Sequence, residues 1–263
     1  MYQFFSKPDR YCGRCGDLQC CVTEHRLSHV PPFLRETRAL FVSDIHVLSG
    51  ASDADMAALT RHMAATRPHI ILLGGDYSDR AEPARRLFRH LSELSAPLGM
   101  FGVPGNNDRE AFPDIDDLRR VMADAGFRLL VNEAERIPLN GGTLIVAGID
   151  DYRHGRPDPA GLFPAGRAPD TFRLLLSHYP RAVSPMPDLM LSGHTHGGQF
   201  NLLGLTPYAI GFERFNRPRR ASVAISGLHD VDGMKLMVSK GVGASRLQLR
   251  VGVRPEIDLL CFQ

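Results

Sequence analysis

The sequence lacks the features that mark several classes of protein. No segment of the 263-residue chain approaches the roughly 18 consecutive apolar residues of a membrane-spanning helix. The first ten residues contain no apolar stretch of the kind found in secretory signals, so we expect a cytoplasmic location. There is no internal repeat and no low-complexity tract. Because 43% of the residues are apolar and 23% are charged, the chain can bury a sizeable core and is not disordered.

The sequence also has little net charge. Lys and Arg together number 31 and Asp and Glu number 29, which leaves a formal charge of +2. A dedicated nucleic-acid-binding domain is strongly basic, so this balance argues against that class of partner. A nuclease is disfavoured on the same ground, although it stays open as an alternative.

From residue 38 onward, short apolar runs alternate with helical patterns. Strands are predicted at 38–43, 69–73, 98–103, 143–147, 172–176, 189–191, 234–238 and 257–262. One predicted helix begins at Asp53 as its N-cap, one contains Leu87 and Leu94, and one runs from Ile115 to a stop at Gly126. Residues 154–170 are rich in Pro and Gly and are expected to form an exposed loop. This order predicts an α/β fold in which a helix-poor second sheet packs on the first.

Polar side chains follow five of the predicted strands, usually beside glycine. They are Asp44 and His46, then Asp76 and Asp79, then Asn106 to Asp108, then His178, and finally His194 and His196. Ligands of open α/β sheets bind at the carboxyl ends of the strands, so one shared site explains all five groups.

The chemistry of these side chains indicates a site for two metal ions. Seven candidate ligands combine carboxylate, amide and imidazole groups: Asp44, His46, Asp76, Asn106, His178, His194 and His196. A mixed oxygen and nitrogen set suits Mn²⁺, Fe or Zn²⁺ better than Ca²⁺. Seven ligands are too many for one ion that must leave room for substrate, whereas two ions sharing a bridging carboxylate would use them.

The motifs Asp-x-His, Gly-Asp-x-x-Asp, Gly-Asn-x-Asp, a lone His and Gly-His-x-His, in this order, resemble the calcineurin-like metallophosphoesterase superfamily. The resemblance implies a sandwich of two mixed β-sheets flanked by helices, over residues 31–263, preceded by a cysteine-containing segment, 1–30. Residues 193–199, 239–243 and 254–256 resemble a bacterial branch of phosphodiesterases, some of which are UDP-diacylglucosamine hydrolases of lipid A synthesis.

The resemblance also implies a role for each residue. One metal goes to Asp44, His46 and His196, and the second to Asn106, His178 and His194, with Asp76 bridging both and Asp79 outside them. A hydroxide held between the two metals is the nucleophile of the superfamily. We therefore expect a dinuclear, metal-dependent hydrolase of phosphodiester or pyrophosphate bonds. The alternative from another class is a non-catalytic metal-binding scaffold on the same fold.

The residues after the ligand Asn106 depart from the superfamily pattern. Asn107 stands where most members carry a histidine that assists the leaving group, and an amide cannot act as a general acid near pH 7. We assign Asn107 and Asp108 to the catalytic residues and expect a preference for bonds whose leaving group departs as an anion. Arg109 is expected to bind a phosphate oxygen, with a solvated arginine at the start of a helix as the alternative.

Two further segments carry predictions. Residues 200–212 are apolar and broken by glycine, and residues 213–220 contain four arginines. This stretch could form a lid over a lipid-linked substrate or a peripheral membrane contact, with Arg214 and Arg217 binding the anionic group, or it could be an edge strand with a solvated loop.

Cysteines crowd near the start of the chain. Of the five cysteines, four lie between residues 12 and 21, so they are not a disulfide framework and we expect a reducing compartment. Cys12, Cys15, Cys20 and Cys21 are candidate ligands of an extra structural zinc, with simple thiols as the alternative.

Overall fold

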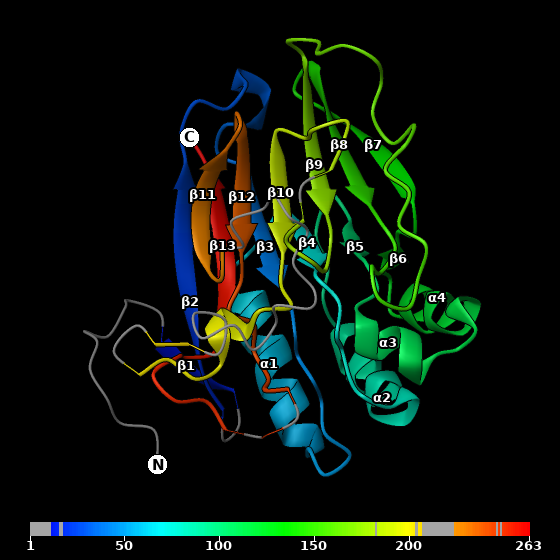
Figure 1. The fold of residues 1–263 in the computed structure, drawn as a ribbon, viewed down its shortest axis with the longest axis vertical. Coiled ribbons are helices and arrows are strands. Elements are labelled where there is room, and N and C mark those ends of the chain that lie inside the picture. Colours follow the sequence, from blue (N-terminus) through cyan, green and yellow to red (C-terminus); the bar gives the residue numbers. More distant parts are fainter. Residues whose placement is uncertain are drawn as a thin grey trace.

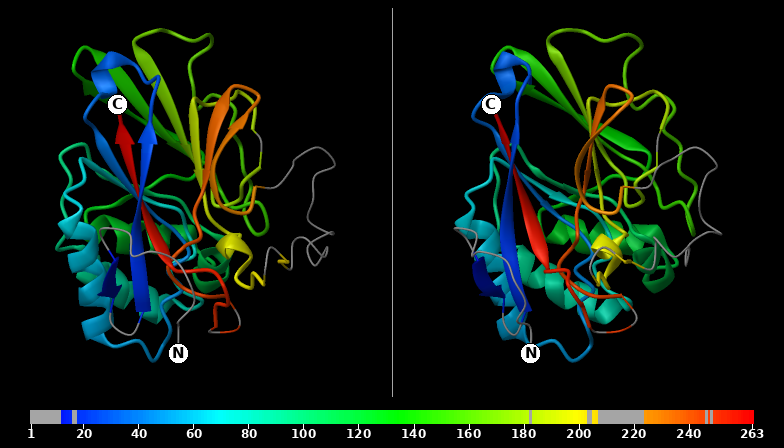
Figure 2. Two further views of the ribbon diagram at one scale, coloured as in Figure 1. Left: turned by 90° about the vertical axis from the view of Figure 1, so that its left-hand side faces the viewer. Right: turned by 60° about the vertical axis from the view of Figure 1, so that its left-hand side comes forward.

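Two sheets packed face to face form the molecule (Figures 1 and 2). The computed structural model describes residues 12–15, 18–181, 183–202, 205–206, 224–245, 247 and 249–263, and only the backbone of residues 12–15 and 18–19. The seven-stranded sheet has the order β1 (Cys12–Cys15), β2 (Leu18–Leu27), β13 (Glu256–Phe262), β3 (Arg38–Val42), β4 (Ile70–Leu73), β5 (Met100–Gly102) and β6 (Arg128–Leu129). The six-stranded sheet has the order β11 (Gly227–Val231), β12 (Met234–Val238), β10 (Leu189–Ser192), β9 (Thr171–Leu176), β8 (Gly142–Gly148) and β7 (Glu133–Leu139).

Both sheets mix parallel and antiparallel pairs. β3, β4, β5 and β6 are parallel neighbours in the first sheet, as are β8, β9, β10 and β12 in the second. Antiparallel pairs join β13 to β3 in one sheet and β7 to β8 in the other. The predicted α/β sandwich of two mixed sheets is therefore confirmed.

The space between the sheets is filled by aliphatic and aromatic side chains. Phe41 and Leu72 from the first sheet pack in one cluster with Leu144 and Leu174 from the second, and all four are buried. The alternate residues of β3 and β4 point to the other face, which explains why these strands read as continuous apolar runs.

Helices cover that other face of the seven-stranded sheet. They are α1 (Asp53–Ala65), α2 (Ala81–Leu91) and α4 (Ile115–Asp124), while α3 (Asn106–Ala111) and the short 3₁₀ turns η1 (Pro32–Leu34) and η2 (His196–Gly198) lie in connections. Met63 of α1 and Leu87 of α2 pack with Leu40 in the buried cluster on this side. No helix among the described residues is long and apolar enough to cross a membrane.

The first helix begins one residue earlier than predicted. Its N-cap is Ser52, not Asp53, and the Ser52 side chain accepts a hydrogen bond from the Asp55 N–H at 3.2 Å. The Asp55 carboxylate in turn accepts from the Ser52 N–H at 3.0 Å. This reciprocal capping box satisfies two backbone donors, whereas a lone cap at Asp53 would satisfy one.

The cysteine-containing segment contributes to the first sheet. β2 pairs in parallel with β13 from Cys21 opposite Glu256 to Leu27 opposite Phe262. Cys20 and Cys21 are buried in this strand. β1 pairs with β2 so that Cys12 lies opposite Cys21, while the side chains of Cys12 and Cys15 are outside the described part of the chain. The structural zinc stays a prediction.

The loop over residues 154–170 is only partly exposed. Most of its residues are exposed or half-buried, as predicted, but Leu162 and Phe163 are buried. These two side chains pack on the outer face of the six-stranded sheet, in a cluster with Ile145 and Met190. The loop therefore supplies the outer apolar layer of that sheet, where the other sheet has helices.

Candidate metal centre

The candidate ligands converge at the carboxyl ends of parallel strands from both sheets. Asp44 and His46 follow β3, Asp76 follows β4, Asn106 follows β5, His178 follows β9, and His194 and His196 follow β10. The structure contains two groups of potential metal ligands, and within each group the ligand atoms lie within 4.8 Å of one another. The first group is Asp44, His46 and His196, and the second is Asp44, Asp76 and His178. All five of these residues are buried. The sequence prediction that separate strand ends meet in one site is reproduced in this geometry.

Asp76 belongs to the second group of donors and also approaches a histidine of the first. Its Oδ2 is 3.5 Å from Nε2 of His46 and 3.3 Å from Nε2 of His178. Its Oδ1 accepts a hydrogen bond from the backbone N–H of Asn107 at 2.8 Å. One carboxylate therefore faces an imidazole of each group.

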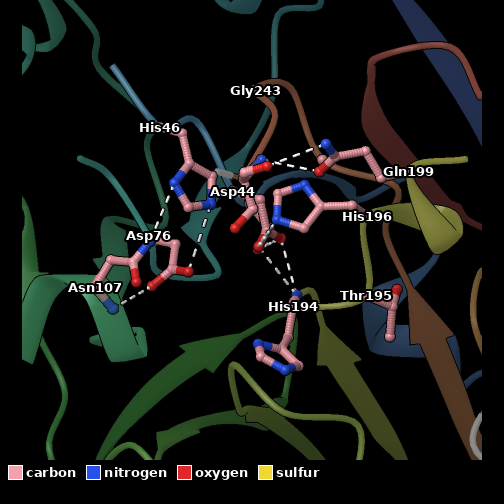
Figure 3. Close-up of polar contacts among 12 residues, drawn as sticks. Asp44, His46, Asp76, Asn107, His194, Thr195, His196, Gln199 and Gly243 are labelled. Carbon is pink, nitrogen blue, oxygen red and sulfur yellow. Dashed lines mark hydrogen bonds and ion pairs between the residues drawn. The ribbon is translucent and has the colours of Figure 1, made fainter. Parts of the chain in front are cut away.

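The other carboxylate, Asp44, faces the segment that follows β10. Its Oδ1 lies 3.4 Å from Nε2 of His196, and its Oδ2 accepts hydrogen bonds from the backbone N–H of His194 at 3.0 Å and the Ser43 hydroxyl at 2.7 Å. Figure 3 shows His196 and the His194 backbone directed at this carboxylate from one side.

The backbone at the site adopts left-handed conformations. Asp44, His46, Asp76, His194 and His196 have φ values of 52°, 44°, 55°, 69° and 52°. Few side chains other than glycine adopt this region, although Asp and His enter it more readily than most residues. The sharp turns that it produces bring side chains that are two residues apart, such as Asp44 and His46, to the same site.

Glycines next to these turns leave no room for a side chain. A Cβ atom at Gly193 would overlap Ser43 Oγ and Asp44 Oδ2, and one at Gly105 would overlap Asp76 Oδ1. Close backbone approach of this kind needs glycine, which explains why glycine precedes the ligand motifs.

Asp79 lies outside the group of donors but contacts it. Its Oδ1 is 3.0 Å from Nδ1 of His46 and accepts a hydrogen bond from the Asn107 side-chain amide at 2.8 Å. Such a partner fixes the ring orientation of His46 and leaves Nε2 turned toward the site.

Asp108, which the sequence analysis assigns to the catalytic residues, is engaged in hydrogen bonds with the backbone. The side chain is completely buried, and its carboxylate accepts hydrogen bonds from the backbone N–H groups of Asp76 at 2.6 Å, Tyr77 at 2.9 Å and Gly105 at 2.9 Å. Burial and the nearby Asp76 raise the pKa of Asp108 to about 7. This geometry gives Asp108 a positioning role, because the carboxylate is committed to the loops that carry the ligands.

Arg109, which is predicted to bind a phosphate oxygen, is engaged in an ion pair within the protein. Its guanidinium forms a two-pronged ion pair with Asp150, with Nε 2.8 Å from Oδ1. The two side chains are only 15% and 5% exposed. Asp150 follows β8, so the pair joins α3 to the segment after that strand, and Arg109 is not the solvated arginine of the alternative.

The side-chain amides of Asn106 and Asn107 contact each other. Asn106 is buried and donates from Nδ2 to Oδ1 of Asn107 at 2.7 Å. Since the amide nitrogen of Asn106 is used in this way, its Oδ1 is the atom left for a cation. Arg214 and Arg217 lie outside the described residues.

Charge at the site is divided unequally among the histidines. Burial alone would lower the pKa of His178, but the adjacent carboxylate of Asp76 outweighs it and raises the pKa to about 10. Burial and the neighbouring charge on His178 lower the pKa of His194 to about 3, and burial lowers that of His196 to about 4. Burial opposes ionisation of Asp76, yet His178 holds the pKa of this carboxyl below its usual value.

These donors fit divalent cations. Within the described part of the chain, the buried Nε2 atoms of His46 and His194 have no hydrogen-bond partner. A buried polar atom without a partner is costly, and an imidazole nitrogen beside buried carboxylates is a typical metal ligand. Two buried carboxylates that lie this close together also need compensating positive charge.

The sequence analysis did not identify two residues, Arg250 and Gln199, that make contacts around the candidate ligand His196. Arg250 is 3% exposed, and its guanidinium lies 3.2 Å from Nδ1 of His196 and donates to the Gly243 carbonyl. Gln199 donates to the carbonyls of Ser245 and Leu247 at 3.0 and 2.8 Å. Nothing in the local sequence reveals these pairings, because they join η2 and the residue after it to a segment about 50 residues later.

Comparisons with known proteins agree with this geometry. The family model for the calcineurin-like phosphoesterase matches residues 37–198, which is more than half of the chain. The metallophosphoesterase YkoQ of Bacillus subtilis is 30% identical, over 86% of this chain and 83% of its own. The phosphodiesterase YaeI of Escherichia coli is 31% identical, over 91% of this chain and 87% of its own. A bovine transmembrane protein with a metallophosphoesterase domain is 28% identical, over 92% of this chain and 56% of its own. The chain therefore belongs to the calcineurin-like phosphoesterase family and is a metal-dependent phosphoesterase.

Proposed function

We propose that the protein is a dinuclear metallohydrolase of phosphodiester or pyrophosphate bonds. The observation that carries this proposal is the position of Asp76, whose Oδ2 lies within 3.5 Å of an imidazole nitrogen from each group of donors. A bridging carboxylate is what two neighbouring cations share. The similarity to the phosphodiesterase of Escherichia coli supports the same class of reaction.

The residues divide between two ions as the resemblance implies. Asp44, His46 and His196 would hold one ion, Asn106, His178 and His194 would hold the other, and Asp76 would be shared between them. Bound Mn²⁺, Fe or Zn²⁺ would lower the pKa of water and polarise the phosphoryl oxygens. The protein itself orients these ligands through Asp79, Asp108 and Arg250, and it excludes water from the buried imidazoles.

Asn107 sets the preference among leaving groups. Its side-chain amide donates to Asp79 and its backbone N–H donates to Asp76. An amide supplies no proton at neutral pH, and losing a general acid costs about 10²- to 10⁴-fold when the leaving group needs one. We therefore expect diphosphates and activated diesters to be better substrates than alkyl monoesters. Equal turnover of a poor leaving group by the wild type and Asn107→His would contradict this preference.

A lipid-linked substrate is supported by the surface beside the site. Five of the exposed large apolar side chains of the described residues lie on two neighbouring segments: Leu202, Leu205, Leu247, Leu249 and Val251. Backbone pairing joins the segments at Phe200 and Val251, and the Gln199 side chain joins them beside η2. An apolar patch next to an active site is typical of contact with acyl chains or a bilayer.

Flotation with liposomes tests the membrane contact. We expect the wild-type protein to float with vesicles that contain anionic lipid. The double variant Leu247→Asp, Leu249→Asp should lose this binding. The matched control is Leu48→Asp, at an exposed leucine outside these two segments. Absence of flotation with both neutral and anionic vesicles would contradict the contact and leave the phosphoesterase proposal untouched.

Hydrolysis of a chromogenic phosphodiester by the Mn²⁺-loaded protein tests the reaction. Asp76→Ala should abolish turnover because both ions would lose their shared ligand, whereas Asp116→Ala, at an exposed position of α4, should retain it. No turnover of diester or pyrophosphate by the loaded wild type would favour the non-catalytic scaffold, and turnover restricted to nucleic acid would favour the nuclease.

A further inference from the structure

One aromatic side chain contacts three of the candidate ligands. The Tyr179 ring is stacked on the His194 ring, with centroids 3.7 Å apart and planes 30° apart. The same ring meets the His178 ring edge-on, at 5.5 Å and 83°. The Tyr179 hydroxyl donates to Oδ1 of Asn106 at 3.3 Å. These three partners are the residues that the proposed function gives to the second ion.

Tyr179 is itself held firmly in place. Its carbonyl accepts hydrogen bonds from the hydroxyl of Ser177 at 2.8 Å and that of Ser192 at 3.4 Å, and both serines are completely buried. Its ring also makes a T-shaped contact with the Tyr152 ring, with centroids 6.1 Å apart, and lies 5.6 Å from the Arg181 guanidinium. A side chain held by several contacts can impose its own orientation on its neighbours.

Each contact restrains a ligand in a different way. The stacked ring fixes the plane of the His194 imidazole, whose Nε2 is buried without a hydrogen-bond partner in the described structure. The phenol hydroxyl and the Asn107 side chain bind opposite ends of the Asn106 amide, so the amide oxygen and nitrogen cannot exchange places. An amide that is turned over would present N–H groups, which do not bind cations.

We propose that Tyr179 is a positioning residue that assembles the second ion site and is dispensable for the first. This inference rests on the proposed dinuclear function. The contrast is Asp79, which contacts His46 of the first ion's ligands through a 3.0 Å hydrogen bond. Partners of this kind are worth about 10- to 100-fold in metal affinity. Replacing Tyr179 should therefore weaken one of two binding events by that factor, and replacing Asp79 should weaken the other.

Binding of Mn²⁺ to the metal-free protein tests the inference without an activity assay. Equilibrium dialysis gives the number and affinity of bound ions, and electron paramagnetic resonance separates a coupled pair of Mn²⁺ ions from a single one. Tyr179→Phe keeps the stacked ring and loses the hydroxyl, while Tyr179→Leu loses both. The control is Tyr152→Phe, which removes a phenol hydroxyl from the neighbouring ring.

We expect the wild type and Tyr152→Phe to bind two ions with the coupled signal. Tyr179→Leu should bind one ion at wild-type affinity and the other about 10- to 100-fold more weakly, so that it shows the signal of a single ion at Mn²⁺ concentrations that just saturate the wild type, with Tyr179→Phe intermediate. Two ions at wild-type affinity in both Tyr179 variants would overturn the inference and leave the dinuclear proposal intact. Equal weakening of both ions in Tyr179→Leu, with Tyr179→Phe unchanged, would show a merely structural role and also overturn it. A wild type that binds a single ion would overturn the dinuclear proposal itself.

Discussion

The carboxylate of Asp108 accepts a hydrogen bond from the backbone N–H of Asp76 at 2.6 Å, from a position that no solvent reaches. Both carboxylate oxygens of Asp108 accept hydrogen bonds from backbone N–H groups. In Asp108→Asn, an NH₂ group would replace one of these oxygens and would face a backbone donor. A buried donor left without a partner costs about 1–3 kcal/mol, so we expect that loss in the free energy of unfolding of the metal-free protein. Displacement of Asp76 should weaken Mn²⁺ binding as well.

Chemical unfolding and Mn²⁺ titration check this expectation, with Asp117→Asn on the exposed face of α4 as the control. Unchanged stability and unchanged metal binding, combined with lost turnover, would return Asp108 to the catalytic role that the sequence suggested.

Gly193→Ala should abolish the site while leaving the fold. The added methyl group would overlap the Ser43 hydroxyl and the Asp44 carboxylate, so Asp44 must move. Gly50→Ala is the matched control, because a Cβ at Gly50 meets no atom within 4 Å. We expect circular dichroism of both variants to match the wild type and Mn²⁺ affinity to fall only in Gly193→Ala. Equal affinity in the two variants would show that Asp44 is not a ligand.

Arg109→Ala should act on stability rather than on substrate affinity. The substitution leaves the nearly buried carboxylate of Asp150 without its ion-pair partner, and breaking a buried pair costs about 3–5 kcal/mol. Arg120→Ala, which breaks an exposed pair with Asp117, should cost no more than about 1 kcal/mol. Urea unfolding measures both. A raised KM at wild-type stability would instead support the phosphate-binding role predicted from the sequence.

Asp258 should make the protein less stable as the pH rises. Burial, aided by Glu256, raises the pKa of this carboxyl from 3.8 to about 6, against the hydrogen bond from His25. The folded state therefore holds this proton more tightly than the unfolded state. The resulting stabilisation is fully present below pH 4 and is lost as the pH rises through 6, up to about 3 kcal/mol at 1.36 kcal/mol per pKa unit.

Unfolding of the metal-free protein at pH 4.5 and pH 8 checks this sign. Asp258→Asn lacks the titrating group, so its stability should fall less between the two pH values than that of the wild type. Asp230→Asn, at an exposed ion pair with Lys235, should follow the wild type. A larger fall in Asp258→Asn would contradict the direction of the shift.

The central strands and the ligand positions could be predicted from the sequence because both are local patterns. β3 and β4 are buried on both faces and therefore appear as unbroken apolar runs. β2, β7 and β11 were not predicted, since each mixes polar and apolar residues along a partly exposed strand. Their place in the sheets depends on partners elsewhere in the chain.

The partners of the ligands could not be predicted for the same reason. Asp150 lies 41 residues from Arg109, and Tyr179 lies 73 residues from Asn106. A single sequence shows that such residues exist but not that they touch. The motif spacing thus indicated which atoms approach a cation, while the residues that orient those atoms emerged only from the folded chain.

The left-handed backbone at five of the candidate ligands has a consequence for transplanting this centre. Each such residue raises the energy of the native state by about 1 kcal/mol or more. The sum is comparable to the whole conformational stability of a modest domain. A short peptide or a small designed scaffold that copied the seven side chains would relax out of these turns. Only a large double-layered interior, like the one beneath these loops, can keep so much local distortion in place.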